Sequence, residues 1–168
     1  MHFSIEDLQY IISLEEVSWG GILMAITLVM HGLGMILTMQ TASGLKHRFQ
    51  QKSSFVKGMS VIILASWMMV LVHIIEVIVW ALFFVWKGAI PNVSLATYIA
   101  LMDYTTLGSP IDLPFRWRLL EGMIAITGLM TFAWSTGVLL TLAQDFQDQE
   151  LQRIKQRHER RAAKPASP

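Results

Sequence analysis

The stretch GMSVIILASWMMVLVHIIEVIVWALFFVW, residues 58–86, decides the fold class of this chain. It is apolar along nearly its whole length, contains no proline, and has His73 and Glu76 as its only ionisable side chains. A helix needs about 20 apolar residues to cross the hydrocarbon core of a bilayer, which is about 30 Å thick. The stretch therefore predicts a membrane-spanning helix, and its extra length predicts that the helix tilts or projects past the interface.

Two more segments have the same character. Residues 19–40 contain no Lys, Arg, Asp or Glu, and residues 119–143 contain only Glu121. The whole chain is 15% charged, whereas soluble domains carry about 25%. These features predict an all-α membrane protein with one transmembrane domain at 19–143. We expect an interfacial segment at 1–18 and a basic helix with a disordered tail at 144–168.

The N-terminal segment has two interpretations. Residues 4–16 can form a short helix that starts at Ser4 and lies on the membrane surface, because a weak apolar stripe follows an acidic first turn. They can equally be a frayed lead-in to the first span.

The basic residues predict the orientation. Lys and Arg cluster in the loop at 41–57 and in the tail after 144, and three spans place both clusters on one side. Because basic clusters stay in the cytoplasm, we expect the C-terminus inside and the N-terminus outside a plasma membrane of bacterial inner-membrane type. The basic residues adjoin apolar spans and form no separate basic domain, which argues against nucleic acid as a partner.

Enzyme classes find little support in the sequence. The chain has no cysteine, so disulfides, thiolate metal sites and Cys nucleophiles are excluded. It also lacks a phosphate-binding loop and a recognisable Ser/His/Asp set. We therefore expect a membrane protein without enzymatic activity.

Residues 93–106 are moderately apolar but too short to cross a membrane. Asn92 or Ser94 can cap the start of a helix there. A half-length helix that enters from outside directs its C-terminus toward the membrane centre, where the partial negative charge of that end favours a cation. The sequence thus predicts a re-entrant helix between spans two and three, as in a cation filter.

Four motifs carry a resemblance to a known family, and together they lie within about residues 60–142. They are HIIEVIVWALFF at 73–84, YTTLG at 104–108, WRLLEG at 117–122 and WSTGVLL at 134–140. In this combination the chain resembles the pore module of the potassium-channel superfamily, and more closely the small three-span bacterial proteins identified as ion-channel family members.

The resemblance implies a fold and a site. It implies an outer helix, a pore helix, a filter and an inner helix, repeated in a homotetramer because a filter needs four loops around one axis. The implied filter residues are Thr105, Thr106, Leu107, Gly108 and Ser109, with K⁺ or another monovalent cation as the bound ion.

The filter motif is incomplete. The family continues with Tyr-Gly-Asp, where this chain has Ser109-Pro110-Ile111. Proline cannot take the positive φ that a filter glycine adopts, since its ring holds φ near −65°. We therefore expect weakened or lost K⁺ selectivity, or no conduction, while Asp112 could still attract cations to the pore mouth. In span three, Gly128 and Gly137 are candidate hinges, although close helix packing is the more common role of such glycines.

Three ionisable residues lie inside the predicted spans. Counting 1.5 Å per residue from Trp19 and Trp86 places His31, His73 and Glu76 at about the same depth. His73 and Glu76 share a face of their helix, and all three side chains can touch if that face meets the first span at Gly32 and Gly34.

The polar cluster allows several functions. It can be a hydrogen-bonded clamp, a divalent-metal or proton site, or a bis-histidine haem site. Two other functions therefore compete with a conducting pore. One is a non-conducting channel-fold protein that binds a metal, haem or a partner protein through these residues. The other is an accessory subunit of a membrane complex.

Overall fold

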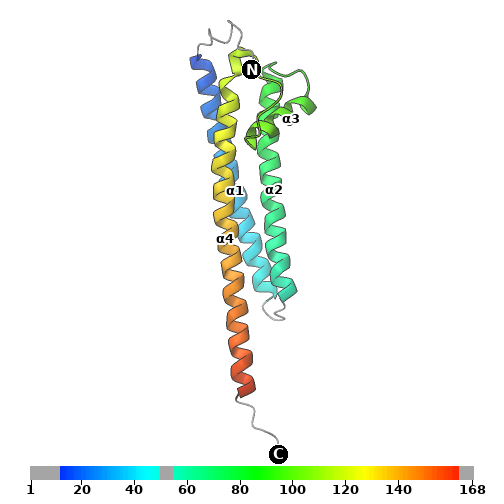
Figure 1. Cartoon of the computed structure of the whole chain (residues 1–168), viewed down its shortest axis with the longest axis vertical. Helices are drawn as coiled ribbons and strands as arrows, with labels where there is room; N and C mark the ends of the chain where they lie inside the picture. The colour runs from blue at the N-terminus through cyan, green and yellow to red at the C-terminus, as the bar shows by residue number, and fades with distance from the viewer. Residues whose placement is uncertain (1–11, 50–54, 163–168) are drawn as a thin grey trace, which may run out of the picture. The chain divides into compact units, whose positions relative to one another are not determined.

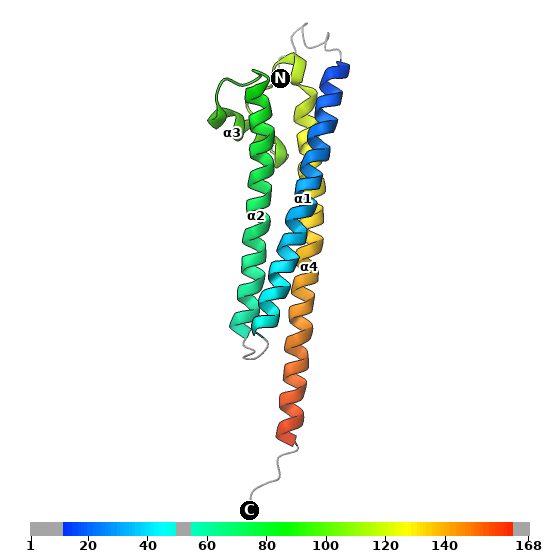
Figure 2. The same ribbon diagram turned by 180° about the vertical axis from the view of Figure 1, so that it is seen from behind.

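The chain forms four α-helices and one short 3₁₀ helix in a computed structural model that describes residues 12–49 and 55–162. Their bounds are α1 Leu14–Phe49, α2 Phe55–Trp86, α3 Val93–Tyr104, η3 Phe115–Trp117 and α4 Leu119–Ala162. No strand occurs in the described residues. The predicted all-α fold is confirmed, and Figures 1 and 2 show α3 beside the C-terminal part of α2.

Within the part of the chain that the structure describes, three segments are long and apolar enough to cross a membrane: Leu14–Lys46, Phe55–Trp86 and a segment running from Phe115 to Gln156. All five prolines of the chain lie outside these segments, so no proline interrupts their backbone hydrogen bonds. Many large apolar side chains point outward from all three, among them Val29, Trp67 and Leu129. The count of three spans made from the sequence agrees with this architecture.

Two boundaries differ from the sequence-based expectations. α1 begins at Leu14 with Ser13 as its cap, because Ser13 Oγ accepts the Glu16 N–H at 3.1 Å. Residues 14–18 therefore belong to the first long helix, and the predicted helix start at Ser4 lies outside the described residues. At the other end, α4 continues from the apolar span into the basic segment without a break near residue 144, since no helix-breaking residue separates them.

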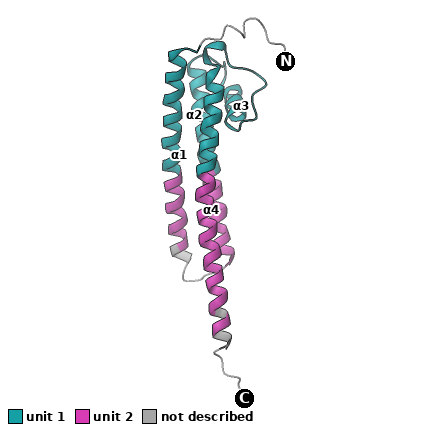
Figure 3. Cartoon of the chain, turned by 60° about the vertical axis from the view of Figure 1, so that its left-hand side comes forward, with its two compact units in different colours: residues 1–34, 70–134 teal, residues 35–69, 135–168 magenta. Residues whose placement is uncertain are grey.

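The chain divides into two compact units, coloured in Figure 3. Unit 1 comprises residues 1–34 and 70–134, and unit 2 comprises residues 35–69 and 135–168. In unit 1 the core is rich in aromatic side chains, with Trp80, Phe84 and Tyr104 fully or almost fully buried. Unit 2 buries Met35, Met69 and Ala65. The ring of Phe146 in α4 packs against Gly58 of α2, at the place that a side chain would otherwise occupy.

The short helix α3 is held in unit 1 by its cap and by its packing. Asn92 caps its start, because Asn92 Oδ1 accepts the Leu95 N–H at 2.8 Å. One face of the helix is buried through Ala96, Ile99 and Ala100. The predicted short helix after Asn92 is thus present, although it ends at Tyr104, two residues before the expected end.

Candidate functional site

A buried polar network lies in unit 1 and joins three of the sequence-predicted residues. His31 Nδ1 of α1 lies 2.9 Å from Glu76 Oε1 of α2, and His73 Nδ1 lies 3.5 Å from Glu76 Oε2. The side chains of His31 and Glu76 are fully buried, whereas that of His73 is 12% exposed. The structure therefore brings His31, His73 and Glu76 into contact.

Two glycines beside His31 allow neighbouring side chains to pack closely against α1. A Cβ on Gly34 would lie 2.6 Å from Val72 Cγ2, so the side chain of Val72 in α2 packs directly against the backbone of α1 there. A Cβ on Gly32 would lie 3.1 Å from the indole of Trp134 in α4. The expected role of Gly34 at the α1–α2 contact agrees with the structure, whereas Gly32 faces α4 instead.

Two residues that sequence reasoning missed complete the network. The Tyr104 hydroxyl donates to Glu76 Oε2, and it lies 2.9 Å from His73 Nδ1 and 2.6 Å from Thr131 Oγ1. Burial raises the pKa of the Tyr104 hydroxyl, so this group stays protonated and can donate. The network thus links side chains from α1, α2, α3 and α4, and Tyr104 connects it to the last turn of the short helix.

Aromatic rings enclose the network. The ring centroids of His31 and Trp134 are 5.5 Å apart, and those of His73 and Phe132 are 4.5 Å apart. The two imidazoles lie 5.2 Å from each other. The two imidazoles, the carboxylate of Glu76 and the flanking rings of Phe132 and Trp134 thus pack into one cluster.

The backbone after α3 forms a tight helix end. The N–H groups of Leu107 and Gly108 both point to the Met102 carbonyl, at 2.9 and 3.2 Å, and the Thr106 N–H points to the Asp103 carbonyl at 2.9 Å. This is the Schellman pattern, which requires a left-handed residue just after the helix. Thr106 is that residue, with φ of 62°.

A threonine in this conformation is unusual. α2 ends with the same hydrogen-bond pattern, but there Gly88 takes the left-handed position with φ of 67°. A β-branched residue is strained at positive φ, and such strain gathers at functional sites. Thr106 therefore combines an unusual backbone conformation with a place in the filter-like motif Thr105-Thr106-Leu107-Gly108.

Asp103 supports the next part of the loop. Its Oδ1 accepts the Ser109 N–H at 3.1 Å, while Oδ2 is buried and has no hydrogen-bond partner among the described residues. Burial raises the pKa of the Asp103 carboxyl to about 6, the Ser109 N–H opposes the shift, and the charge of Asp112 adds to it. Sequence reasoning did not single out Asp103, because its burial and its hydrogen bond to Ser109 depend on how the loop folds back.

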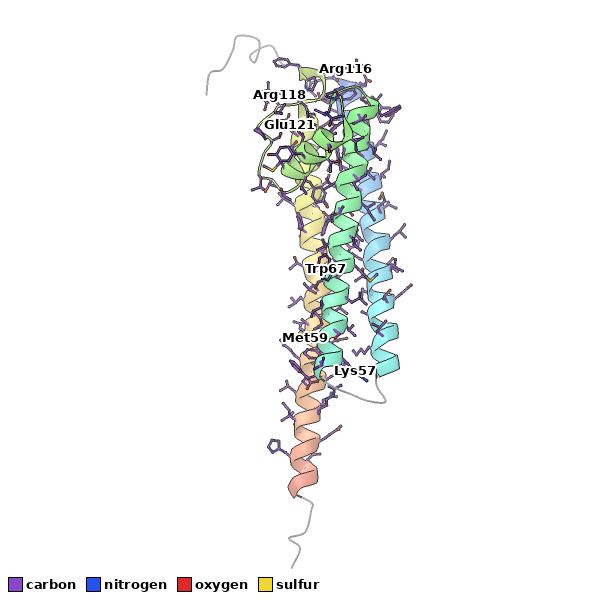
Figure 4. All side chains as sticks on the ribbon, turned by 90° about the vertical axis from the view of Figure 1, so that its right-hand side faces the viewer. Lys57, Met59, Trp67, Arg116, Arg118 and Glu121 are labelled. Carbon is purple, nitrogen blue, oxygen red and sulfur yellow. The ribbon has the colours of Figure 1, made fainter. Side chains whose placement is uncertain are left out.

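Three other predicted residues have ordinary surroundings. Asp112 forms an ion pair with Arg118 at 2.5 Å, so its charge is already engaged. A Cβ on Gly128 would collide with the Tyr104 carbonyl oxygen, and Gly128 is therefore a close-packing position. A Cβ on Gly137 would meet no neighbouring atom within 4 Å. Figure 4 shows Arg118 with Arg116 and Glu121 near the start of α4.

Comparisons with models of protein families, with curated proteins and with solved structures find no match to this chain.

Proposed function

We propose that this chain is one subunit of a cation-conducting membrane pore, in which four copies place their Thr105–Gly108 loops around a common axis. The observation that carries the proposal is the direction of the loop carbonyls. In a trans peptide the C=O points opposite to the N–H. Since the N–H groups of residues 106, 107 and 108 point back at α3, the carbonyls of Thr105, Thr106 and Leu107 point away from it.

These three carbonyls suit a cation site. They follow the C-terminal end of α3, which bears partial negative charge. Leu107 and its neighbour Gly108 are exposed on the single chain, and Leu107 is 73% exposed. Rings of backbone carbonyls replace the hydration shell of a permeating ion in cation filters. Four exposed loops of this kind supply such rings, whereas one loop alone does not enclose an ion.

The same loop sets a limit on selectivity. Pro110 stands where a second filter glycine is expected, and Ser109 Oγ accepts the Ile111 N–H at 3.2 Å, which turns the chain locally. Only the first half of a filter is therefore available. We expect a pore that passes monovalent cations with little preference for K⁺ over Na⁺.

Reconstitution into planar bilayers tests the proposal, with two matched variants. Gly108 and Gly88 both have positive φ, at 76° and 67°, and neither has an atom within 4 Å of an added Cβ. Alanine at either site costs about 1–2 kcal/mol of backbone strain. This cost lowers the population of the native loop conformation, relative to other conformations, about tenfold. We expect Gly108→Ala to lower the current about tenfold or more and Gly88→Ala to leave it near wild type.

The oligomeric state is the second arm of the test. Native mass spectrometry in mild detergent should give a tetramer for the wild type and for Gly88→Ala. A wild-type protein that carries no cation current and runs as a monomer or dimer would falsify the pore.

A further inference from the structure

We propose that His31, His73 and Glu76 form a binding site for a divalent transition-metal ion of the zinc type. One ring nitrogen of each histidine and a carboxylate oxygen of Glu76 all lie within 4.8 Å of one another. Two imidazoles and one carboxylate are a common ligand set for zinc and its neighbours. This inference stands apart from the proposed pore, because binding needs only one chain.

The separations already resemble those around a bound ion. Zinc–nitrogen and zinc–oxygen distances are about 2.1 Å, so ligand atoms of a tetrahedral ion lie about 3.4 Å apart. His31 Nδ1 is 2.9 Å from Glu76 Oε1, and His73 Nδ1 is 3.5 Å from Glu76 Oε2. Each imidazole thus already has one oxygen of Glu76 at a separation close to that between two ligands of one ion.

The surroundings also suit a metal. The carboxylate of Glu76 is fully buried, and the helix that carries it, α2, is mostly apolar. A bound cation would offset the cost of burying this charge. The Tyr104 hydroxyl donates to Glu76, and Thr131 contacts that hydroxyl in turn. Outer partners of this kind orient metal ligands and sharpen affinity.

His73 is the member of the cluster that reaches the surface of the chain. His31 and Glu76 are fully buried, but the side chain of His73 is 12% exposed. Its neighbour Phe132 is 39% exposed, and the two rings are 4.5 Å apart. The single chain therefore exposes the cluster only at the edge of His73.

Cobalt absorption and zinc titration of the purified full chain, made without a polyhistidine tag, test the site. Co²⁺ should give visible d–d bands of tetrahedral or five-coordinate type, and Zn²⁺ should bind at one ion per chain and abolish them. His73→Ala and Glu76→Gln should each weaken zinc binding about 100-fold, and Tyr104→Phe, which removes an outer hydrogen bond, about 10-fold or more.

The matched control is His158→Ala, since His158 is an exposed histidine in the tail portion of α4. It should leave the cobalt spectrum and the zinc affinity unchanged. Circular dichroism and size-exclusion chromatography check that each variant is folded. A wild-type protein without cobalt bands and without zinc stoichiometry overturns the proposal, and so does equal zinc binding by folded His73→Ala and wild type. A pore that conducts but binds no metal would refute this site and leave the proposed function standing.

Discussion

Glu15 and Glu16 are neighbours in the first turn of α1, yet they have different surroundings. Glu15 is 43% exposed and pairs with Arg116 at 2.5 Å and with Lys87 at 3.9 Å. Glu16 is almost completely buried, and its Oε1 accepts the backbone N–H of Leu119 at 2.5 Å. Leu119 begins α4, so Glu16 satisfies an N–H that the helix itself leaves without a partner.

We predict that Glu16→Ala lowers the free energy of unfolding by about 1–2 kcal/mol, because it removes this cap and leaves a buried donor without its acceptor. Glu15→Ala should cost about 0.5 kcal/mol or less, since exposed ion pairs contribute little. Denaturant unfolding of both variants in detergent micelles measures the difference. Equal losses for the two variants would show that Glu16 does not act as a cap.

Asp103 gives a prediction for pH. Its pKa rises from 3.8 to about 6 on folding because of burial. The folded state then binds the proton more tightly than the unfolded state, so the contribution of Asp103 to stability is complete below about pH 4 and is lost as pH rises through 6. At about 1.4 kcal/mol per pKa unit, the loss amounts to at most about 3 kcal/mol.

Asp103→Asn should remove this pH dependence. We expect the wild-type melting temperature to fall relative to that of Asp103→Asn between pH 4 and pH 7. Asp148→Asn is the control, because Asp148 is exposed on α4, and it should follow the wild type. Parallel curves for wild type and Asp103→Asn across this window would contradict the assignment.

At the scale of the elements, α3 depends on a close approach to α4. The backbone of Gly128 lies against the Tyr104 carbonyl, whereas Gly137, nine residues further along the same helix, has open space around it. An added methyl group at Gly128 must push α3 and α4 apart. At Gly137 it only replaces glycine with a better helix former.

We therefore predict opposite signs for two identical changes in α4. Gly128→Ala should destabilise the protein by about 1–3 kcal/mol through overpacking, and Gly137→Ala should stabilise it by about 0.5–1 kcal/mol. Thermal unfolding in detergent gives both values. If Gly137 were instead a hinge, Gly137→Ala would alter the proposed current without this gain in stability.

The elements were easier to predict than their contacts. Three long apolar segments and a short capped one follow from hydropathy and turn residues. The meeting of His31 with His73 and Glu76 follows from counting depth along two helices. Counting depth along the long helices does not find Tyr104, which lies on the short helix α3, or Thr131. A threonine in an apolar helix can bond to its own backbone, and Thr131 Oγ1 does lie 3.1 Å from the Thr127 carbonyl, so its presence in the sequence does not indicate a tertiary contact.

Some contacts have no local signal at all. Glu16 and Leu119 are 103 positions apart in the chain, and their hydrogen bond depends on how α1 packs against α4. Thr106 was named only as a residue of the filter-like motif, and its left-handed conformation was not predicted, since the left-handed residue after a helix is normally glycine. Its conformation emerges from the hydrogen bonds that close α3.

For the molecule as a whole, one end of unit 1 is marked by tryptophans. The Lys87 ammonium lies 4.2 Å from the Trp19 ring centroid, 4.6 Å from that of Trp86 and 5.7 Å from that of Trp117. Tryptophan and lysine gather at the boundary between lipid and water. Together with the basic loop and tail, this cluster predicts that Lys87 and the start of α3 face the outside of the cell.

Because the chain has no cysteine, single-cysteine variants report this orientation directly. Ser94→Cys lies at the exposed start of α3, and Gln152→Cys lies on the exposed surface of α4 beyond its apolar part. In intact bacterial spheroplasts, a membrane-impermeant maleimide should label Ser94→Cys fully and Gln152→Cys only after the membrane is broken. The cysteine-free wild type, which should stay unlabelled, is the control. Labelling of Gln152→Cys but not Ser94→Cys in intact spheroplasts would mean that the chain has the opposite orientation, with the Thr105–Gly108 loop entering from the cytoplasm.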